Sequence, residues 1–66
     1  NPVSDRLYLK GIAAGSNIEL CSIMGTVINS GSYTSAGIDT STLPSGSYFV
    51  RVQSEGNWKT SPFIKL

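Results

Sequence analysis

Side chains that commonly carry out catalysis are scarce in this sequence. It has no histidine and a single cysteine, Cys21, among 66 residues. A Ser-His-Asp or Cys-His nucleophile, a metal site with histidine ligands and a zinc finger each need residues that are missing here. A single cysteine also excludes a disulfide within the chain. The sequence therefore predicts no catalytic, metal-binding or cofactor-binding residues.

Four carboxylates remain as candidates for acid–base chemistry: Asp5, Glu19, Asp39 and Glu55. Catalysis by carboxylates requires a second group placed to work with the first, and the spacing of these four indicates no such pair. Asp39 alone lies within a motif, where its side chain is expected to bond the backbone of the following turn. We therefore expect that the chain is not an enzyme.

The composition and net charge of the chain exclude further classes of function. Charged residues make up 14% of the chain and the formal net charge is +1, so no basic surface for nucleic acid is expected. Hydrophobic residues make up 39%, which is typical neither of a disordered tail nor of a segment that inserts into a membrane. Cys21 lies in an apolar run and is interpreted as a small core residue.

Turn residues divide the chain into segments of strand length. The seven glycines fall at short intervals, and no window keeps the apolar spacing of an amphipathic helix. Alternation is clearest over residues 46–54, where Tyr48, Val50 and Val52 are predicted to point inward. The pattern predicts an all-β fold, a small immunoglobulin-like antiparallel β-sandwich of six to seven short strands that occupies residues 1–66 as a single domain. A small barrel has the same local pattern and is the alternative.

Shorter strands are predicted earlier in the chain. Alternation over residues 6–10 and 17–22 predicts two of them, and a further short strand is expected around Ile38. A hairpin loop that ends at Gly25, in the left-handed conformation, leads into a strand through Val27. The inward residues of the first two strands are predicted to be Leu7, Leu9, Ile18 and Leu20.

The last segment is predicted to form a hairpin with the clearest strand. Glu55-Gly56 provides a tight turn, after which the chain returns over residues 57–66. Pro62 has no N–H to donate to a ladder, so this strand is expected at an edge or with a bulge. Trp58 and Ile64 are predicted to point inward, and Lys59 and Lys65 outward.

A turn precedes the strand over residues 46–54. Leu43 and Tyr48 flank Pro44 and Gly46, and this spacing is similar to the tyrosine corner of immunoglobulin-like sandwiches. There the tyrosine hydroxyl bonds a backbone group a few residues upstream, which gives the side chain a hydrogen-bond partner. The motif predicts fold, not function.

Several motifs follow one another in a fixed order along the whole chain. Asn1-Pro2 precedes an alternating strand, a hairpin loop ends at Gly25, and Ile38-Asp39 is followed by Leu-x-x-Gly-x-Tyr at Leu43, Gly46 and Tyr48. The chain closes with a strand that carries Lys59 and ends in Phe63-Ile64-Lys65-Leu66. In this order and spacing the motifs resemble the C-terminal sorting domain of cargo proteins of the type IX (Por) secretion system of Gram-negative bacteria. Cys21-Ser22 and Ser61-Pro62 depart from the family pattern, as does the final Leu66.

The resemblance implies a secretion signal without catalytic activity. Such a domain is the C-terminal part of a larger secreted protein and has the outer-membrane translocon and its shuttle proteins as partners. After a periplasmic intermediate, the cargo reaches the cell surface or the medium. A sortase-like cell-surface peptidase then usually removes the domain as the cargo is anchored to the surface. Cleavage is expected at or before Asn1.

The terminal strand is the hypothesised recognition surface. An exposed strand at the end of the chain can offer its backbone to a partner sheet. The residues assigned to this role are Lys59, Phe63, Ile64, Lys65 and Leu66.

Two other functions compete with a secretion signal. One is an adhesive or carbohydrate-binding module of an extracellular enzyme, with Tyr8, Phe49 and Trp58 as stacking residues. The other is a passive spacer or dimerisation module that pairs through its edges.

Overall fold

The computed structural model describes residues 2–66, with the side chains of residues 4–66, so Asn1 of the predicted opening turn lies outside the described residues. Strands make up the regular structure of this part of the chain, which confirms the all-β prediction. The strands are β1 (Pro2–Val3), β2 (Arg6–Leu7), β3 (Asn17–Ser22), β4 (Val27–Ser32), β5 (Ile38–Asp39), β6 (Gly46–Ser54) and β7 (Asn57–Lys65).

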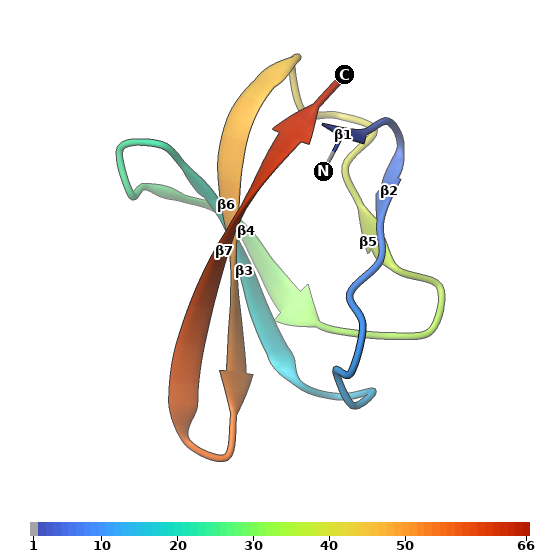
Figure 1. Cartoon of the computed structure of the whole chain (residues 1–66), viewed down its shortest axis with the longest axis vertical. Helices are drawn as coiled ribbons and strands as arrows, with labels where there is room; N and C mark the ends of the chain where they lie inside the picture. Colours follow the sequence, from blue (N-terminus) through green and yellow to red (C-terminus); the bar gives the residue numbers. More distant parts are fainter. Residues whose placement is uncertain (1) are drawn as a thin grey trace.

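The strands form two sheets. Five of them make a large sheet in the order β1-β7-β6-β3-β4, and β2 pairs with β5 in a two-stranded sheet. Neighbours are antiparallel except for β1 and β7, which run parallel. In Figure 1 the twisted hairpin of β6 and β7 dominates the large sheet, and β2 and β5 lie together to one side of it. The large sheet is open, so the sandwich prediction is confirmed and the barrel alternative does not apply.

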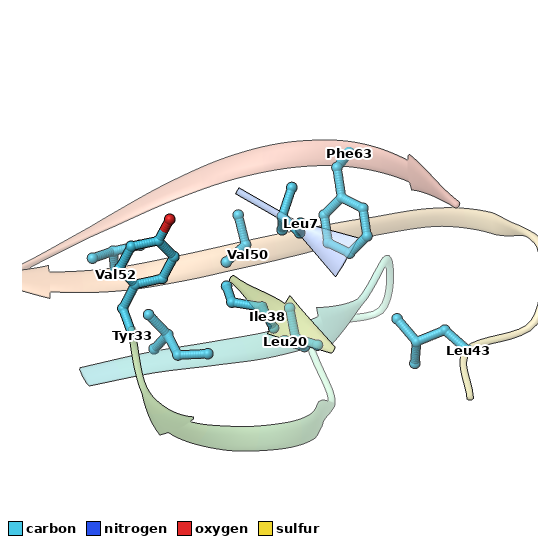
Figure 2. Packing of buried hydrophobic residues seen from close by; sticks show 9 residues of the cluster. Leu7, Leu20, Tyr33, Ile38, Leu43, Val50, Val52 and Phe63 are labelled. Carbon is cyan, nitrogen blue, oxygen red and sulfur yellow. The ribbon is translucent and has the colours of Figure 1, made fainter. Parts of the chain in front are cut away.

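The hydrophobic core lies between the two sheets (Figure 2). In β6 the predicted alternation is confirmed, because Val50 and Val52 are buried while Arg51 and Gln53 face away from the core. Residues that face one another across β3 and β6 extend this apolar face, with Leu20 opposite Val50 and 1% exposed. The buried cluster comprises Leu7, Ile18, Leu20, Tyr33, Ile38, Leu43, Val50, Val52 and Phe63.

Two predicted turns have the expected geometry. The Gly25 N–H donates to the Ser22 carbonyl at 2.9 Å, and Gly25 has φ 87°, as the β3–β4 hairpin requires. Between β6 and β7, Glu55 and Gly56 have φ 53° and 81°. Positive φ at both central residues is the signature of a type I′ turn, whose twist matches that of the flanking strands.

Two tyrosines fasten loops to the large sheet. The Tyr48 hydroxyl donates to the Pro44 carbonyl at 2.6 Å, as the predicted tyrosine corner requires. Its ring stacks on Phe63 with centroids 5.6 Å apart. Tyr33 has a second such role that the sequence did not reveal: its hydroxyl accepts from the Leu9 N–H at 2.9 Å and donates to the Leu9 carbonyl at 3.2 Å. These bonds hold the segment after β2 in place.

Asp39 has the structural role that its motif predicts. Its Oδ1 accepts from the Ser41 hydroxyl at 2.7 Å and from the Ser41 N–H at 2.9 Å. These two hydrogen bonds, the side-chain bond first, lower the pKa of the Asp39 carboxyl. The next residue, Thr40, is fully buried, and its N–H donates to the Asp5 carbonyl at 2.9 Å. The turn after β5 is thereby fixed to the segment before β2.

The first predicted strand is shorter than expected. Pairing with β5 extends over Arg6 and Leu7 alone, and the chain leaves the sheet at Tyr8. Leu7 is buried and Leu9 is half-buried, so both still contribute to the core as predicted. The segment from residue 8 to residue 12 forms a loop that lies beside the large sheet.

The predicted facing of β7 is wrong. Trp58 and Ile64, predicted inward, are 39% and 48% exposed, whereas Lys65, predicted outward, is 8% exposed. The two-residue turn places Val52 opposite Lys59 and Tyr48 opposite Phe63. Residues opposite one another in the ladder share a face of the sheet, and a shift of one residue would exchange the two faces. Since Val52 faces the core, Lys59 lies on the core side as well, and the inward residues of β7 are the odd-numbered ones.

Candidate functional site

The residues hypothesised to contact the secretion machinery divide into two groups. Phe63 and Lys65 face the core and are buried, so their side chains do not form an exposed surface. The Lys65 Nζ donates to the Leu66 carbonyl at 3.3 Å. The exposed group is Lys59, Ile64 and Leu66.

Within residues 2–66, the outer edge of β7 is paired over only part of its length. β1 pairs with Ile64 and Lys65, and β6 occupies the other side of the strand throughout. Hydrogen-bonded and non-hydrogen-bonded pairs alternate along an antiparallel ladder, starting with a bonded pair next to a two-residue turn. This alternation directs the backbone groups of Trp58, Thr60 and Pro62 away from β6.

Pro62 therefore fits into a nine-residue strand without disrupting it. At an outward position the missing N–H removes no bond to β6, but it leaves the edge without a donor at that point. The prediction that a proline-bearing strand lies at an edge is confirmed for residues 57–63. Among the residues that the structure describes, Pro62 and β1 together restrict the accessible edge to residues 57–61.

A cleft of about 670 Å³ lies next to this edge, on the core side of the sheet. Its apolar lining includes Val50 and Val52 of β6 and Phe63 of β7. The opposite wall includes Leu9 and Ile12, which belong to the loop that Tyr33 holds in place. The cleft thus separates the β6–β7 hairpin from the segment that follows β2.

The charged side chains in the lining of the cleft are both cationic. Lys59 projects from β7, and Lys10 belongs to the loop on the other wall. Both residues are exposed. Sequence reasoning paired Lys59 with Lys65 because both lie near the end of the chain, whereas the fold places Lys59 and Lys10 on the same cleft.

The face of the large sheet that points away from the core carries a polar network. Arg51 Nη1 lies 2.8 Å from Glu19 Oε1, and the Arg51 guanidinium lies 4.9 Å from the centre of the Trp58 ring. Asn17 Nδ2 donates to Gln53 Oε1 at 2.8 Å. Trp58 therefore forms a cation–π contact with Arg51 across the β6–β7 ladder. This contact explains why the indole ring of Trp58 occupies an exposed position.

The three aromatics of the carbohydrate-binding alternative do not share one surface. Tyr8 lines the cleft on the core side of the sheet. Phe49 and Trp58 lie on the other side, because they belong to positions that alternate with Val50 and Phe63. A sugar-stacking platform formed by all three is incompatible with this arrangement.

The described part of the chain offers neither a metal site nor a membrane-spanning helix. No group of three or more His, Cys, Asp or Glu side chains there could hold a metal ion. Within residues 2–66, no helix has the length and apolar character needed to cross a membrane. Cys21 is buried, as predicted for a small interior residue.

A comparison with known protein families shows to which family the chain belongs. Residues 1–65 match the family described as the secretion system C-terminal sorting domain. The chain belongs to this family. As a type IX secretion sorting domain it is a C-terminal signal for export across the outer membrane to the cell surface or the extracellular space. No curated protein and no solved structure gave a significant match.

The cleft of this sorting domain was not foreseen from the sequence. Lys10 and Ile12 lie more than 45 residues from Lys59 in the chain, and no local pattern connects them. The one available signal was the proline of β7, which indicated that an edge would be exposed.

Proposed function

We propose that this domain is a non-catalytic address that the type IX translocon and its shuttle proteins read through β7. The observation that carries the proposal is the family match over residues 1–65. The accessible edge and the exposed Ile64 and Leu66 support β7 as the contact surface. Cargo proteins differ widely, so a common folded element that presents backbone groups suits a machine that must accept many of them.

The domain acts as one unit, residues 1–66, at the C-terminal end of a larger secreted protein. The cargo passes through a periplasmic intermediate before export. A sortase-like cell-surface peptidase then removes the domain by cleaving at or before Asn1. The cut lies outside the sandwich because a protease binds a segment whose backbone is free. The strands of a folded sheet are already paired with their neighbours and do not provide such a segment.

A reporter fusion tests this proposal. Residues 1–66, with a short upstream linker, are joined to the C-terminus of a fluorescent protein that carries an ordinary signal peptide, in a bacterium with a type IX system. The same reporter without the domain is the control. We expect the fusion at the surface or in the medium, shortened by the mass of the domain, and the control in the periplasm. Retention of both in the periplasm, with the domain folded, would contradict the proposal.

A further inference from the structure

The accessible edge of β7 and the cleft beside it form one continuous surface. The edge offers outward backbone groups at Trp58 and Thr60, and Pro62 limits it on one side. A strand added there would lie about 4.8 Å from β7 and would direct every second side chain toward the core side of the sheet. That side is where the cleft opens.

The lining of the cleft indicates what those side chains should be. Its floor is apolar, with Val50, Val52 and Phe63. Lys10 and Lys59 line its walls, and no carboxylate does so. A segment with small apolar side chains and an acidic one between them would bury apolar area and place its charge beside two ammonium groups.

We propose that the cleft binds an extended, acidic segment of a protein of the secretion machinery, which pairs with β7 over residues 57–61. This inference rests on the proposed function and names the chemistry of the partner at that site. Backbone hydrogen bonds to Trp58 and Thr60 provide affinity, and Lys10 and Lys59 select for negative charge. The loop wall is preorganised, because both hydrogen bonds of the Tyr33 hydroxyl hold Leu9 in place.

Peptide binding to the 66-residue chain tests the chemistry directly. The probes are two seven-residue peptides of alternating Thr and Val with a central Glu in one and a central Lys in the other. Amide chemical shifts are followed by NMR during each titration. We expect the Glu peptide to shift Trp58, Thr60 and Leu9, and to bind about tenfold more tightly than the Lys peptide. Equal affinities, or shifts confined to β4, would overturn the inference.

Three variants identify the groups responsible. Lys10→Ser with Lys59→Ser should weaken the Glu peptide about tenfold, while Arg6→Ser, which removes one positive charge outside the lining of the cleft, should not. Thr60→Pro removes an outward N–H as Pro62 already does, so the fold is retained while strand addition is lost. Unchanged binding in both the double lysine variant and Thr60→Pro would contradict the inference.

Export of the same variants separates this inference from the proposed function. If the unmodified domain exports the reporter and the double lysine variant does so equally well, the acidic partner is wrong and the sorting role stands. If the unmodified domain exports nothing, the sorting role itself is wrong. Sedimentation of the free chain tests whether a second copy is the occupant instead. Pairing of two copies through β7 would appear as a dimer that Thr60→Pro abolishes, and that result would also overturn the inference.

Discussion

The large sheet has two edges with different chemistry. At one, β7 carries Pro62 and Lys59 and is covered at its end by β1. At the other, all six residues of β4 are exposed, and the chain carries no charge from residue 20 to residue 38. Proline, lysine and a covering strand are the devices by which proteins prevent unspecific pairing of sheet edges. β4 has only its short length and a bulge near Ile28.

The two edges differ in how much of the backbone is free to pair with another strand and in which side chains surround it. The edge of β7 is long, but within the described residues β1 and Pro62 leave only residues 57–61 of it accessible. The edge of β4 is accessible throughout, and Val27 and Ile28 are both nearly half exposed. A specific partner suits the first edge, whereas the second is where we expect weak self-association.

The largest effect is expected at the inward positions of β7. Phe63→Ala removes a ring that is 2% exposed and stacks on Tyr48. Truncation of a buried Phe costs about 3–5 kcal/mol, which is a large fraction of the stability of a small domain. Circular dichroism should find Phe63→Ala largely unfolded and Ile64→Ala folded. The reverse order would contradict the register of β7.

A smaller loss of stability is expected from Tyr48→Phe, which affects neither edge. The variant removes the hydroxyl that donates to the Pro44 carbonyl and keeps the ring on Phe63. A hydrogen bond of this kind contributes about 1 kcal/mol. Urea unfolding should give a decrease of that order, while sedimentation should find association unchanged. No change in the urea midpoint would mean that the tyrosine corner does not stabilise the fold.

A charge on β4 should reduce self-association with little effect on stability. Ile28→Lys changes an exposed residue at the bulge, so the free energy of unfolding should stay within about 0.5 kcal/mol. Lysine at an edge disfavours pairing with another strand. Sedimentation at several concentrations should find less dimer than for the unmodified chain. An equal amount of dimer would show that β4 is not the associating edge.

The smallest effect on the fold is expected from Pro62→Thr. The new N–H points away from β6, so the ladder within the sheet is unaffected and the variant should unfold at nearly the same temperature. Because a donor is restored, the accessible edge of β7 becomes longer. Light scattering should detect faster aggregation than for the unmodified chain. Aggregation at the same rate would mean that Pro62 does not protect this edge.

The features predicted correctly from the sequence are those that depend on residues close together in the chain. The alternation of β6 depends on residues within a few positions, and the tyrosine corner and the Gly25 turn have short signatures. The facing of β7 depended on a competition between two signals. Trp58 and Ile64 are apolar and favoured one face, but the two-residue turn sets the register and imposed the other.

The cleft required information that no local pattern contains. It depends on the pairing of β2 with β5 and on the hydrogen bonds between Tyr33 and Leu9. Each of these is a contact between residues far apart in the chain. The edge itself was predictable, since a proline within a strand pattern is compatible with few other positions.

The exposed apolar residues at the end of β7 are expected to direct export, and two matched variants examine this expectation in one experiment. Ile64→Ser with Leu66→Ser changes two exposed apolar residues at the end of β7, and Ile23→Ser with Met24→Ser changes two exposed apolar residues at the β3–β4 hairpin. All four are at least 48% exposed, so both variants should stay folded, which circular dichroism checks. In the reporter fusion we predict that the first variant stays in the periplasm and the second is exported. Export of both, or retention of the second alone, would contradict the account.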